Sequence, residues 1–334
     1  MLPTSRYKDT TTSRGFNYHY YYIPAQGSKQ TLLFCHGFPS TSQDWHRVVP
    51  HFEQQGYGII VPDTLGYGGT DKPLDPAAYK GTLLAKDMID IVDAEKLDKI
   101  IAIGHDWGSF IVARLASVAP ERILAYAFLA LAYIPPNPDF NFEASLKATK
   151  EVFGYEIFGY QAFLADDGAA ALVENNWDTL FGVIWPHNPE LWKTHVAPFV
   201  GLKETIEEGE LRPLPSYLSE KDKKVMSKAL LDGGLAAPTC YYKVQVRGLD
   251  LEDELTIPKD RYLPPTSSPI FFGATLKDYI CIADMQKGLF TDPKFKDHSL
   301  TIHDYDADHW VLLSHAKELN KDLDEWLANI IPTL

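Results

Sequence analysis

The segment 104–108, Gly-His-Asp-Trp-Gly, has the residue types and spacing of a reactive turn. It follows the apolar run 99–103 and precedes the amphipathic stretch 109–116, which predicts a strand, a sharp turn and a helix. The flanking glycines permit a strained turn and leave room around the central side chain, Asp106. The start of the following helix should favour the ionised carboxylate. Asp106 is therefore predicted to be a nucleophile, with a buried helix cap as the alternative.

An Asp at this position favours one class of reaction. A carboxylate that attacks an ester or amide forms an anhydride, which is a poor route to hydrolysis. Attack on an electrophilic sp³ carbon, as in an epoxide or an alkyl halide, gives an ordinary ester that water can cleave. Ser109 lies on the predicted helix, where its hydroxyl would not face the site, so the sequence argues against a serine esterase.

Cleavage of such an ester needs a base to activate water and an acid to orient that base. Among 11 histidines, His309 lies between the last predicted strand and the last predicted helix, at the sheet edge where ligands gather in α/β folds. Asp278 follows another predicted strand and is the expected acid. The order Asp106, Asp278, His309 is the one expected for this kind of fold. Asp306 and Asp308 are rival acids, which are expected to be solvated or capping.

A turn after an early strand supplies the opposite wall of the predicted site. His-Gly-Phe-Pro at 36–39 follows the apolar run 31–35. The backbone N–H groups of Phe38 and Trp107 are expected to hold the oxyanion that forms when water attacks the ester. His36 is expected to contact the substrate.

Together these motifs resemble the soluble epoxide hydrolase group of α/β-hydrolases, along essentially the whole chain. The matching segments occur in the family's order and spacing at 36–39, 63–71, 104–108, 277–278 and 308–310. The resemblance implies the α/β-hydrolase fold with an inserted, mainly helical cap. It also implies hydrolysis of an epoxide to a vicinal diol through an ester on Asp106, with no metal or organic cofactor.

The resemblance further implies two cap tyrosines that hydrogen-bond the epoxide oxygen. Ring opening generates an alkoxide, to which a phenol can donate a proton. Phe-Gly-Tyr-Gln matches the first tyrosine motif and assigns Tyr160, and Cys-Tyr-Tyr-Lys matches the second and assigns Tyr242. The second motif departs from the family's Asn-Trp-Tyr-Arg in its first two positions. Tyr155 and Tyr241 are the nearest register alternatives and are expected to pack.

Haloalkane dehalogenases share the Asp nucleophile, and Ser109 after the turn is also typical of them. In that group the Trp after the nucleophile and a second donor, often Asn, hold the departing halide. That second donor stands at the third position of the early loop. Trp107 is present here, but the third position of the loop is Phe38, which has no side-chain donor. The tyrosines favour an epoxide, with haloalkane dehalogenase as the alternative. A non-catalytic ligand-binding protein on the same fold is a further alternative. It is disfavoured because such proteins usually lose a triad member, whereas this chain has candidates for all three.

Alternation of strand-like and helical segments predicts an α/β fold with a mostly parallel central sheet flanked by helices. The strand-like runs are 18–23, 31–35, 58–61, 99–103, 124–132, 270–273 and 300–302, and a final helix is expected from about 310 to 331. Between 135 and 265 the sequence is helical, aromatic and irregular. We therefore expect a core of 1–134 and 266–334 interrupted by a helical cap of 135–265. Within the cap, the charged segment 203–224 is expected to be a long excursion.

Composition limits the partners. The chain of 334 residues has a net charge of −14, which argues against nucleic acid and anionic membranes. Without a signal peptide or an apolar run long enough for a membrane span, a cytoplasmic location is expected. Cys35, Cys240 and Cys281 lack metal-ligand spacing and are expected to be buried free thiols. A small apolar epoxide and water are the expected reaction partners, and the sequence is compatible with a homodimer.

Overall fold

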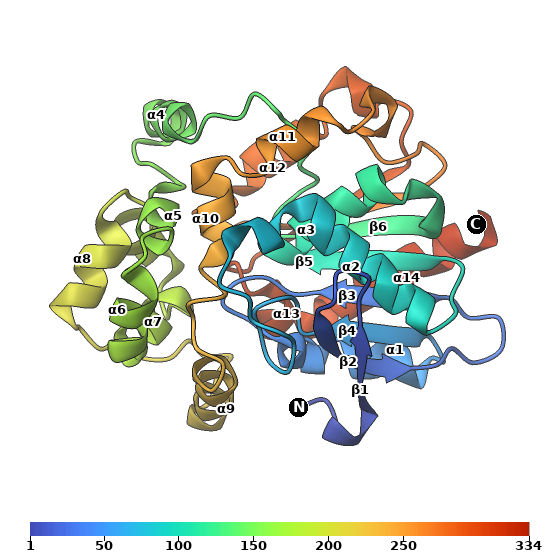
Figure 1. Ribbon diagram of the computed structural model, residues 1–334, viewed down its shortest axis with the longest axis horizontal. Coiled ribbons are helices and arrows are strands. Elements are labelled where there is room, and N and C mark those ends of the chain that lie inside the picture. Colours follow the sequence, from blue (N-terminus) through green and yellow to red (C-terminus); the bar gives the residue numbers. More distant parts are fainter. Residues whose placement is uncertain (334) are drawn as a thin grey trace.

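The computed structural model describes residues 1–333, which are organised around an eight-stranded sheet (Figure 1). The strand order is β1-β2-β4-β3-β5-β6-β7-β8. β2 pairs antiparallel with both β1 and β4, and the remaining ladders are parallel. This confirms the predicted fold class. Leu334, the last residue of the predicted core segment 266–334, lies outside the described residues.

The strands are β1 (Tyr7–Thr11), β2 (Asn17–Ile23), β3 (Thr31–Cys35), β4 (Gly58–Pro62), β5 (Ile100–His105), β6 (Ile123–Leu129), β7 (Ile270–Thr275) and β8 (Leu300–Tyr305). Seven of them lie within a few residues of the predicted runs. β1 is the exception, because this edge strand exposes Lys8, Asp9 and Thr11 and has no apolar run to reveal it. The parallel strands β3, β4 and β5 are fully buried, which explains their continuous apolar sequences.

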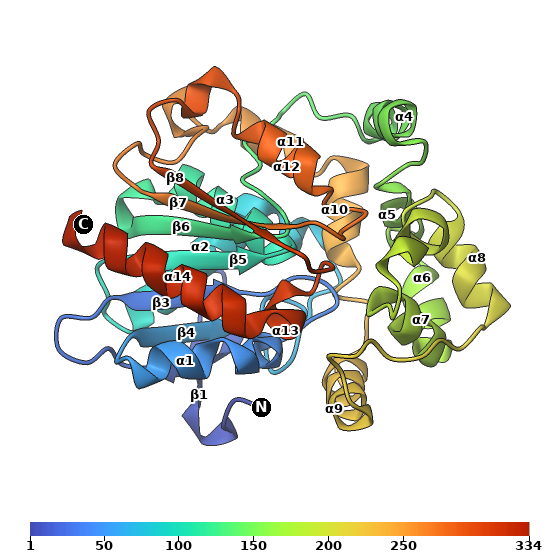
Figure 2. The ribbon, with the colours of Figure 1, turned by 180° about the vertical axis from the view of Figure 1, so that it is seen from behind.

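Helices cover both faces of the sheet. In Figure 1, α2 (Gly81–Ala94) and α3 (Trp107–Val118) lie in front of it. Figure 2 shows α1 (Val49–Gln54) and α14 (Ala316–Ile330) on the opposite face. A further helix, α12 (Ala283–Leu289), follows β7. Within residues 1–333, no helix has both the length and the apolar character needed to cross a bilayer.

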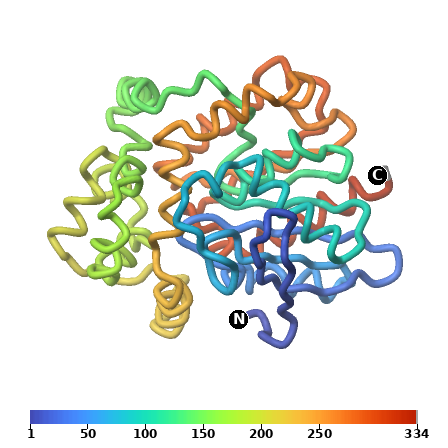
Figure 3. Tube along the Cα trace, viewed as in Figure 1, coloured from blue at the N-terminus to red at the C-terminus, as the bar shows by residue number. Residues whose placement is uncertain are grey.

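The chain between β6 and β7 contains eight α-helices, most of which project to one side of the sheet (Figure 3). They are α4 (Phe142–Phe153), α5 (Gly159–Leu164), α6 (Ala169–Asn175), α7 (Trp177–Ile184), α8 (Gly201–Glu208), α9 (Glu220–Leu231), α10 (Cys240–Arg247) and α11 (Leu251–Leu255). Their helical character agrees with the sequence, while the division into core and cap at 134/135 and 265/266 stays a prediction.

Two element predictions were right only in part. Half of the segment 203–224 is helix, namely 203–208 in α8 and 220–224 in α9, and the irregular connection between these helices is 209–219. The final helix is also not continuous, because the backbone of His315 leaves the helical region (φ −123°, ψ 27°). This break separates α13 (Val311–Ser314) from α14.

A buried ion pair ties α3 to α11. The Arg114 guanidinium pairs with the Glu254 carboxylate, and both side chains are almost fully buried. Arg114 also donates to the Ile134 carbonyl at 2.8 Å, while Glu254 accepts from the Asn137 amide at 2.6 Å. The pair therefore joins the first and last segments of the β6–β7 insertion to the helix that follows β5.

Removing one partner of this pair should destabilise the protein strongly. Glu254→Ala leaves the Arg114 charge buried without compensation, and about 3–5 kcal/mol of unfolding free energy should be lost. Urea unfolding monitored by circular dichroism measures this loss. The double variant Arg114→Met, Glu254→Leu is the control and should recover most of the stability. A Glu254→Ala protein as stable as the wild type would contradict the claim that the Arg114–Glu254 pair stabilises the fold.

Candidate active site

Asp106 lies at the sharp turn between β5 and α3. Its backbone adopts φ 55° and ψ −125°, a strained conformation for a residue other than glycine. The turn fits only because its neighbours are small: a Cβ on Gly108 would lie 2.0 Å from the Cys35 carbonyl oxygen. A Cβ on Gly37 would lie 2.2 Å from the Asp106 Oδ1 atom. The glycines therefore hold the carboxylate above the end of the sheet, as the predicted turn requires.

The structure brings Asp106, Asp278 and His309 together. His309 Nδ1 donates to Asp278 Oδ2 at 2.6 Å, and His309 Nε2 lies 3.6 Å from Asp106 Oδ2. Asp278 Oδ1 accepts from the Ile280 and Cys281 amides at 2.9 and 2.8 Å. The three residues follow β5, β7 and β8, whose carboxyl ends meet at one edge of the sheet. Asp278 is thereby held in place, orients the imidazole and leaves Nε2 directed to Asp106.

Burial and charge act in opposite directions on these groups. Burial raises the pKa of Asp106, although His309 and the Phe38 and Trp107 amides partly offset this shift. The Trp107 amide at the start of α3 favours the ionised carboxylate, as expected, but burial outweighs it. Burial acts to lower the pKa of His309, but the neighbouring carboxylates outweigh it, Asp278 first, and the net pKa is raised.

Two backbone amides donate hydrogen bonds to the Asp106 carboxylate. The Phe38 N–H donates to Asp106 Oδ1 at 2.8 Å. The Trp107 amide also hydrogen-bonds the Asp106 carboxylate. Both amides expected to form an oxyanion hole therefore contact the Asp106 carboxylate, with Oδ1 bound by Phe38 and Oδ2 near His309.

Tyr160 on α5 and Tyr242 on α10 both reach the space around Asp106. Their ring centroids lie 5.6 Å apart, and the Tyr242 ring packs edge-on against Phe38 at 4.9 Å. Burial raises the pKa of both phenols, and the charge of Asp106 adds to the effect, so each stays protonated at neutral pH. Both hydroxyls are therefore available as donors.

The hydroxyls of Tyr155 and Tyr241, the two alternatives to Tyr160 and Tyr242, form hydrogen bonds away from Asp106. The Tyr155 hydroxyl donates to the Tyr279 carbonyl at 2.7 Å. The Tyr241 hydroxyl donates to the Leu65 carbonyl at 3.0 Å, inside the core. Neither residue lines a cavity that contains Asp106.

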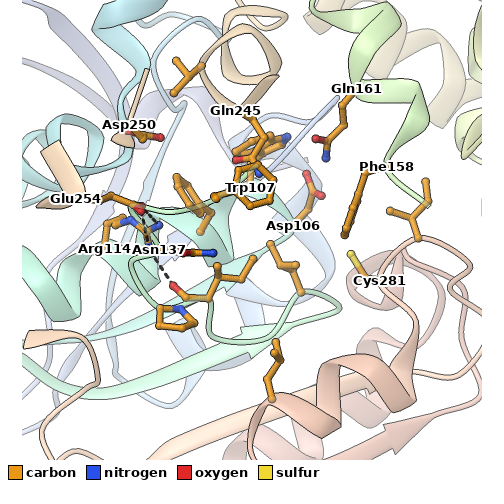
Figure 4. A pocket seen from close by; sticks show the side chains of 18 of the residues that line it. Asp106, Trp107, Arg114, Asn137, Phe158, Gln161, Gln245, Asp250, Glu254 and Cys281 are labelled. Atoms are coloured by element: carbon orange, nitrogen blue, oxygen red, sulfur yellow. Dashed lines mark hydrogen bonds and ion pairs between the residues drawn. The ribbon is translucent and has the colours of Figure 1, made fainter. Parts of the chain in front are cut away.

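Asp106 lies between two cavities of different size. The larger, of about 250 Å³, is mainly apolar and is drawn in Figure 4, where Asp106, Trp107 and Gln161 lie at one part of the wall and Glu254 at another. The smaller, of about 20 Å³, is bounded by Phe38, Trp192, Tyr242 and His309. Asp106, Tyr160 and Ile280 line both cavities.

His36 lies outside both cavities, contrary to its predicted role in substrate contact. Its Nε2 accepts from the Thr64 amide at 3.0 Å, and its Nδ1 faces the Gly37 carbonyl at 3.0 Å. Burial lowers the pKa of His36 to about 4, so the ring is neutral. Both nitrogens are used to hold the 36–39 turn, which positions Phe38.

Of the rival acids, Asp306 is exposed and pairs with Lys277 at 2.7 Å, as expected. Asp308 is capping, since it accepts from the Trp310 amide at 3.0 Å, but it is buried rather than solvated. Its second oxygen accepts from the Tyr217 hydroxyl at 2.7 Å. Asp308 therefore anchors the His309 loop to the 209–219 connection.

Sequence reasoning missed two residues that contact His309. His105 Nε2 donates to the His309 carbonyl at 2.8 Å, and its pKa is held far below the usual range by burial. The Trp192 ring packs at 45° to the His309 ring, with centroids 5.3 Å apart, and Trp192 begins a π-helical turn, 192–196. Such turns are frequent at functional sites. The position of His105 inside the reactive turn was an available signal, whereas nothing local singled out Trp192.

One group of side chains in residues 1–333 could supply metal ligands in this region. Asp278, Cys281 and His309 offer ligand atoms within 4.8 Å of one another. A metal ion there would compete with the hydrogen bond between His309 and Asp278.

Comparisons with known proteins agree with this architecture. A model of the alpha/beta hydrolase fold matches residues 30–155. The chain is 28% identical over 305 residues to a bifunctional epoxide hydrolase 2 of Sus scrofa, covering 90% of this chain and 52% of that protein. It is 28% identical over 251 residues to an epoxide hydrolase 3 of Siraitia grosvenorii, covering 75% and 74%.

The structure of an epoxide hydrolase from an endophytic Streptomyces superposes with a TM-score of 0.79 at 24% identity, covering 98% of this chain and 96% of that one. The chain spans about half the length of the first curated relatives it matches. Their names confirm the resemblance that the motifs indicated. The chain therefore has the α/β-hydrolase fold and is related in sequence to epoxide hydrolases.

Proposed function

We propose that the chain hydrolyses epoxides to vicinal diols through a covalent ester on Asp106. The observation that carries the proposal is that the two oxygens of the Asp106 carboxylate have different partners. Asp106 Oδ1 accepts from the Phe38 amide, while Oδ2 lies beside His309 and faces space lined by Tyr160 and Tyr242. The names of the sequence relatives support the same reaction.

In the first step, Asp106 Oδ2 attacks a ring carbon of the epoxide. The new carbon–oxygen bond forms as the ring carbon–oxygen bond breaks, and the released oxygen takes a proton from Tyr160 or Tyr242. The product is a hydroxyalkyl ester of Asp106. Because the buried phenols are neutral, they supply a proton where an alkoxide develops, and this interaction is strongest in the transition state.

In the second step, His309 Nε2 removes a proton from water as the water oxygen adds to the ester carbonyl. The carbonyl oxygen is the former Oδ1, so the oxyanion accepts from the Phe38 and Trp107 amides. Collapse breaks the ester, and the departing diol oxygen recovers the proton from His309. Asp278 stabilises the transient imidazolium through its hydrogen bond to Nδ1. Hydrolysis leaves the Asp106 carboxyl protonated, and loss of this proton through the solvent to the tyrosinate of the first step restores both groups.

The small cavity supports a place for the hydrolytic water. It is lined by Asp106, His309 and Tyr242, and its volume of about 20 Å³ exceeds the roughly 10–15 Å³ that one water needs. The larger cavity, mainly apolar and joined to the same Asp106, is suited to the substrate. Substrate and water would thus approach Asp106 from different sides.

We also propose that the 135–265 segment acts as a cap. Tyr160 and Tyr242 come from α5 and α10 of this segment, whereas Asp106, Asp278 and His309 come from elements flanking it. A reaction that needs both sets requires the segment to be seated over the sheet edge.

Haloalkane dehalogenation is the second candidate, since Trp107 lines the large cavity. Its usual second halide donor has no counterpart at Phe38, whose side chain packs against Tyr242. The tyrosine pair therefore favours an epoxide over a haloalkane.

A panel of apolar epoxides and matched haloalkanes tests the proposal. Diol formation from epoxides without halide release from haloalkanes is expected, with diols quantified by gas chromatography and halide by ion chromatography. Asp106→Ala is the control and should abolish diol formation. Halide release without diol formation would establish the dehalogenase alternative instead.

A further inference from the structure

The larger cavity extends from Asp106 to a group of charged residues at its opposite end. Close to Asp106 its wall includes the Trp107 and Phe158 rings (Figure 4). The other end is formed by Arg114 of α3, Asp250 and Glu254 (Figure 4). A long substrate whose epoxide reaches Asp106 would therefore bring its remote end toward these three residues.

Arg114 is the sole cationic residue among those that line the cavity in residues 1–333, and both of its terminal nitrogens are engaged by protein groups. One terminal nitrogen pairs with Glu254, and the other donates to the Ile134 carbonyl at 2.8 Å. The guanidinium carbon lies 4.3 Å from the centre of the Phe110 ring, and Nε is enclosed without a partner. A carboxylate in the cavity would thus find no free cation.

Asp250 is a second carboxylate beside the Arg114–Glu254 pair. Its Oδ1 accepts from the Gly81 amide at 2.9 Å, and no other hydrogen bond reaches its carboxylate in the described chain. The residue is 8% exposed and lines the cavity. Burial raises its pKa to about 6, so the carboxylate is mainly ionised at neutral pH. Arg114 partly offsets the effect of burial on the pKa of Asp250, but it faces two carboxylates, so the group Arg114, Asp250 and Glu254 has one net negative charge and one free acceptor oxygen.

We propose that Asp250 determines substrate specificity, by excluding epoxides with a remote carboxylate and favouring neutral ones that carry a remote hydroxyl. Like charges in a desolvated cavity repel strongly, because the interior screens them far less than water does. A hydroxyl instead donates to the Asp250 carboxylate without bringing a second charge. The inference rests on the proposed function and names the class of epoxide that it would take.

Three compounds with one carbon skeleton test this inference. They are terminal epoxides on an unbranched chain whose other end is a carboxylic acid, its methyl ester or a primary alcohol. In the wild type at neutral pH, kcat/KM for the alcohol and the ester should exceed that for the acid by at least about tenfold. The alcohol should be the best substrate.

Asp250→Asn isolates the charge, because the amide oxygen can still accept from Gly81. In this variant the ratio of alcohol to acid should fall to about threefold or less, chiefly through faster turnover of the acid. Glu252→Gln is the matched control: it removes one negative charge from α11 at an exposed position that does not line the cavity. Its ratio should equal that of the wild type. A purely structural effect of Asp250→Asn would slow all three substrates alike.

A binding measurement separates this inference from the proposed reaction. Cyclopropane analogues of the three compounds cannot be opened, and their affinities for the wild type and Asp250→Asn can be measured by calorimetry. If no epoxide is hydrolysed but the acid analogue binds at least tenfold more weakly than the alcohol, the proposed function fails and the charge selection stands. Equal binding of acid and alcohol, or a ratio unchanged by Asp250→Asn, would overturn the inference.

Discussion

His309→Gln is expected to trap the protein as a stable ester on Asp106. Ring opening depends on Asp106 and the two tyrosines, so it should proceed without the imidazole. Hydrolysis of the ester depends on His309 Nε2, which glutamine does not replace as a base. Intact-protein mass spectrometry should show a mass increase equal to the substrate. Steady-state turnover should fall by several orders of magnitude, as in other triads that lose their base.

His303→Gln is the control for this experiment. His303 lies on β8 and faces Asp322 at 3.3 Å, away from both cavities, so its replacement should leave turnover close to wild type. Normal turnover by the His309→Gln protein would remove His309 from the mechanism, despite its 2.6 Å hydrogen bond to Asp278.

Replacing Tyr160 and Tyr242 together with Phe should block the first step instead of the second. Each change removes one hydroxyl and keeps the ring. Loss of a single transition-state donor typically slows a reaction by roughly 10²–10³. One tyrosine can partly cover for the other, so the double variant should show the larger loss. No ester should accumulate even when His309→Gln is added, which mass spectrometry would reveal.

The matched control is the double variant Tyr155→Phe, Tyr241→Phe. These hydroxyls donate to the Tyr279 and Leu65 carbonyls, so their loss should affect stability more than ring opening. Full epoxide-opening activity in the Tyr160→Phe, Tyr242→Phe protein would overturn the tyrosine assignment. The dehalogenase alternative would then gain most, because a departing halide needs no proton.

The elements of the sheet were predictable because buried parallel strands leave continuous apolar runs. Thr31–Cys35, for example, is buried at all five positions and has the predicted bounds. The reactive turn was equally visible, since Gly108 and Gly37 stand where a Cβ would collide with Cys35 or Asp106. Local sequence is informative wherever the constraint on a residue is itself local.

Other features depend on contacts that no local pattern encodes. Asp308 is buried and accepts a hydrogen bond from Tyr217, 91 positions away. His36 was misassigned because its Thr64 partner comes from a different loop. The Arg114–Glu254 pair, which spans 140 positions, was likewise invisible. The start of α9 was a missed local signal, since Ser219 and Asp222 form a capping box that the sequence displays.

The origin of the oxygen added to the diol tests the covalent mechanism most directly. A single turnover is run in ¹⁸O-labelled water with the enzyme in excess, and diol and protein are analysed by mass spectrometry. If Asp106 is the nucleophile, the diol should be unlabelled, and a peptide containing Asp106 should carry the heavy oxygen. Label that enters the diol directly, with none in Asp106, would show that water attacks the epoxide and would contradict the central claim.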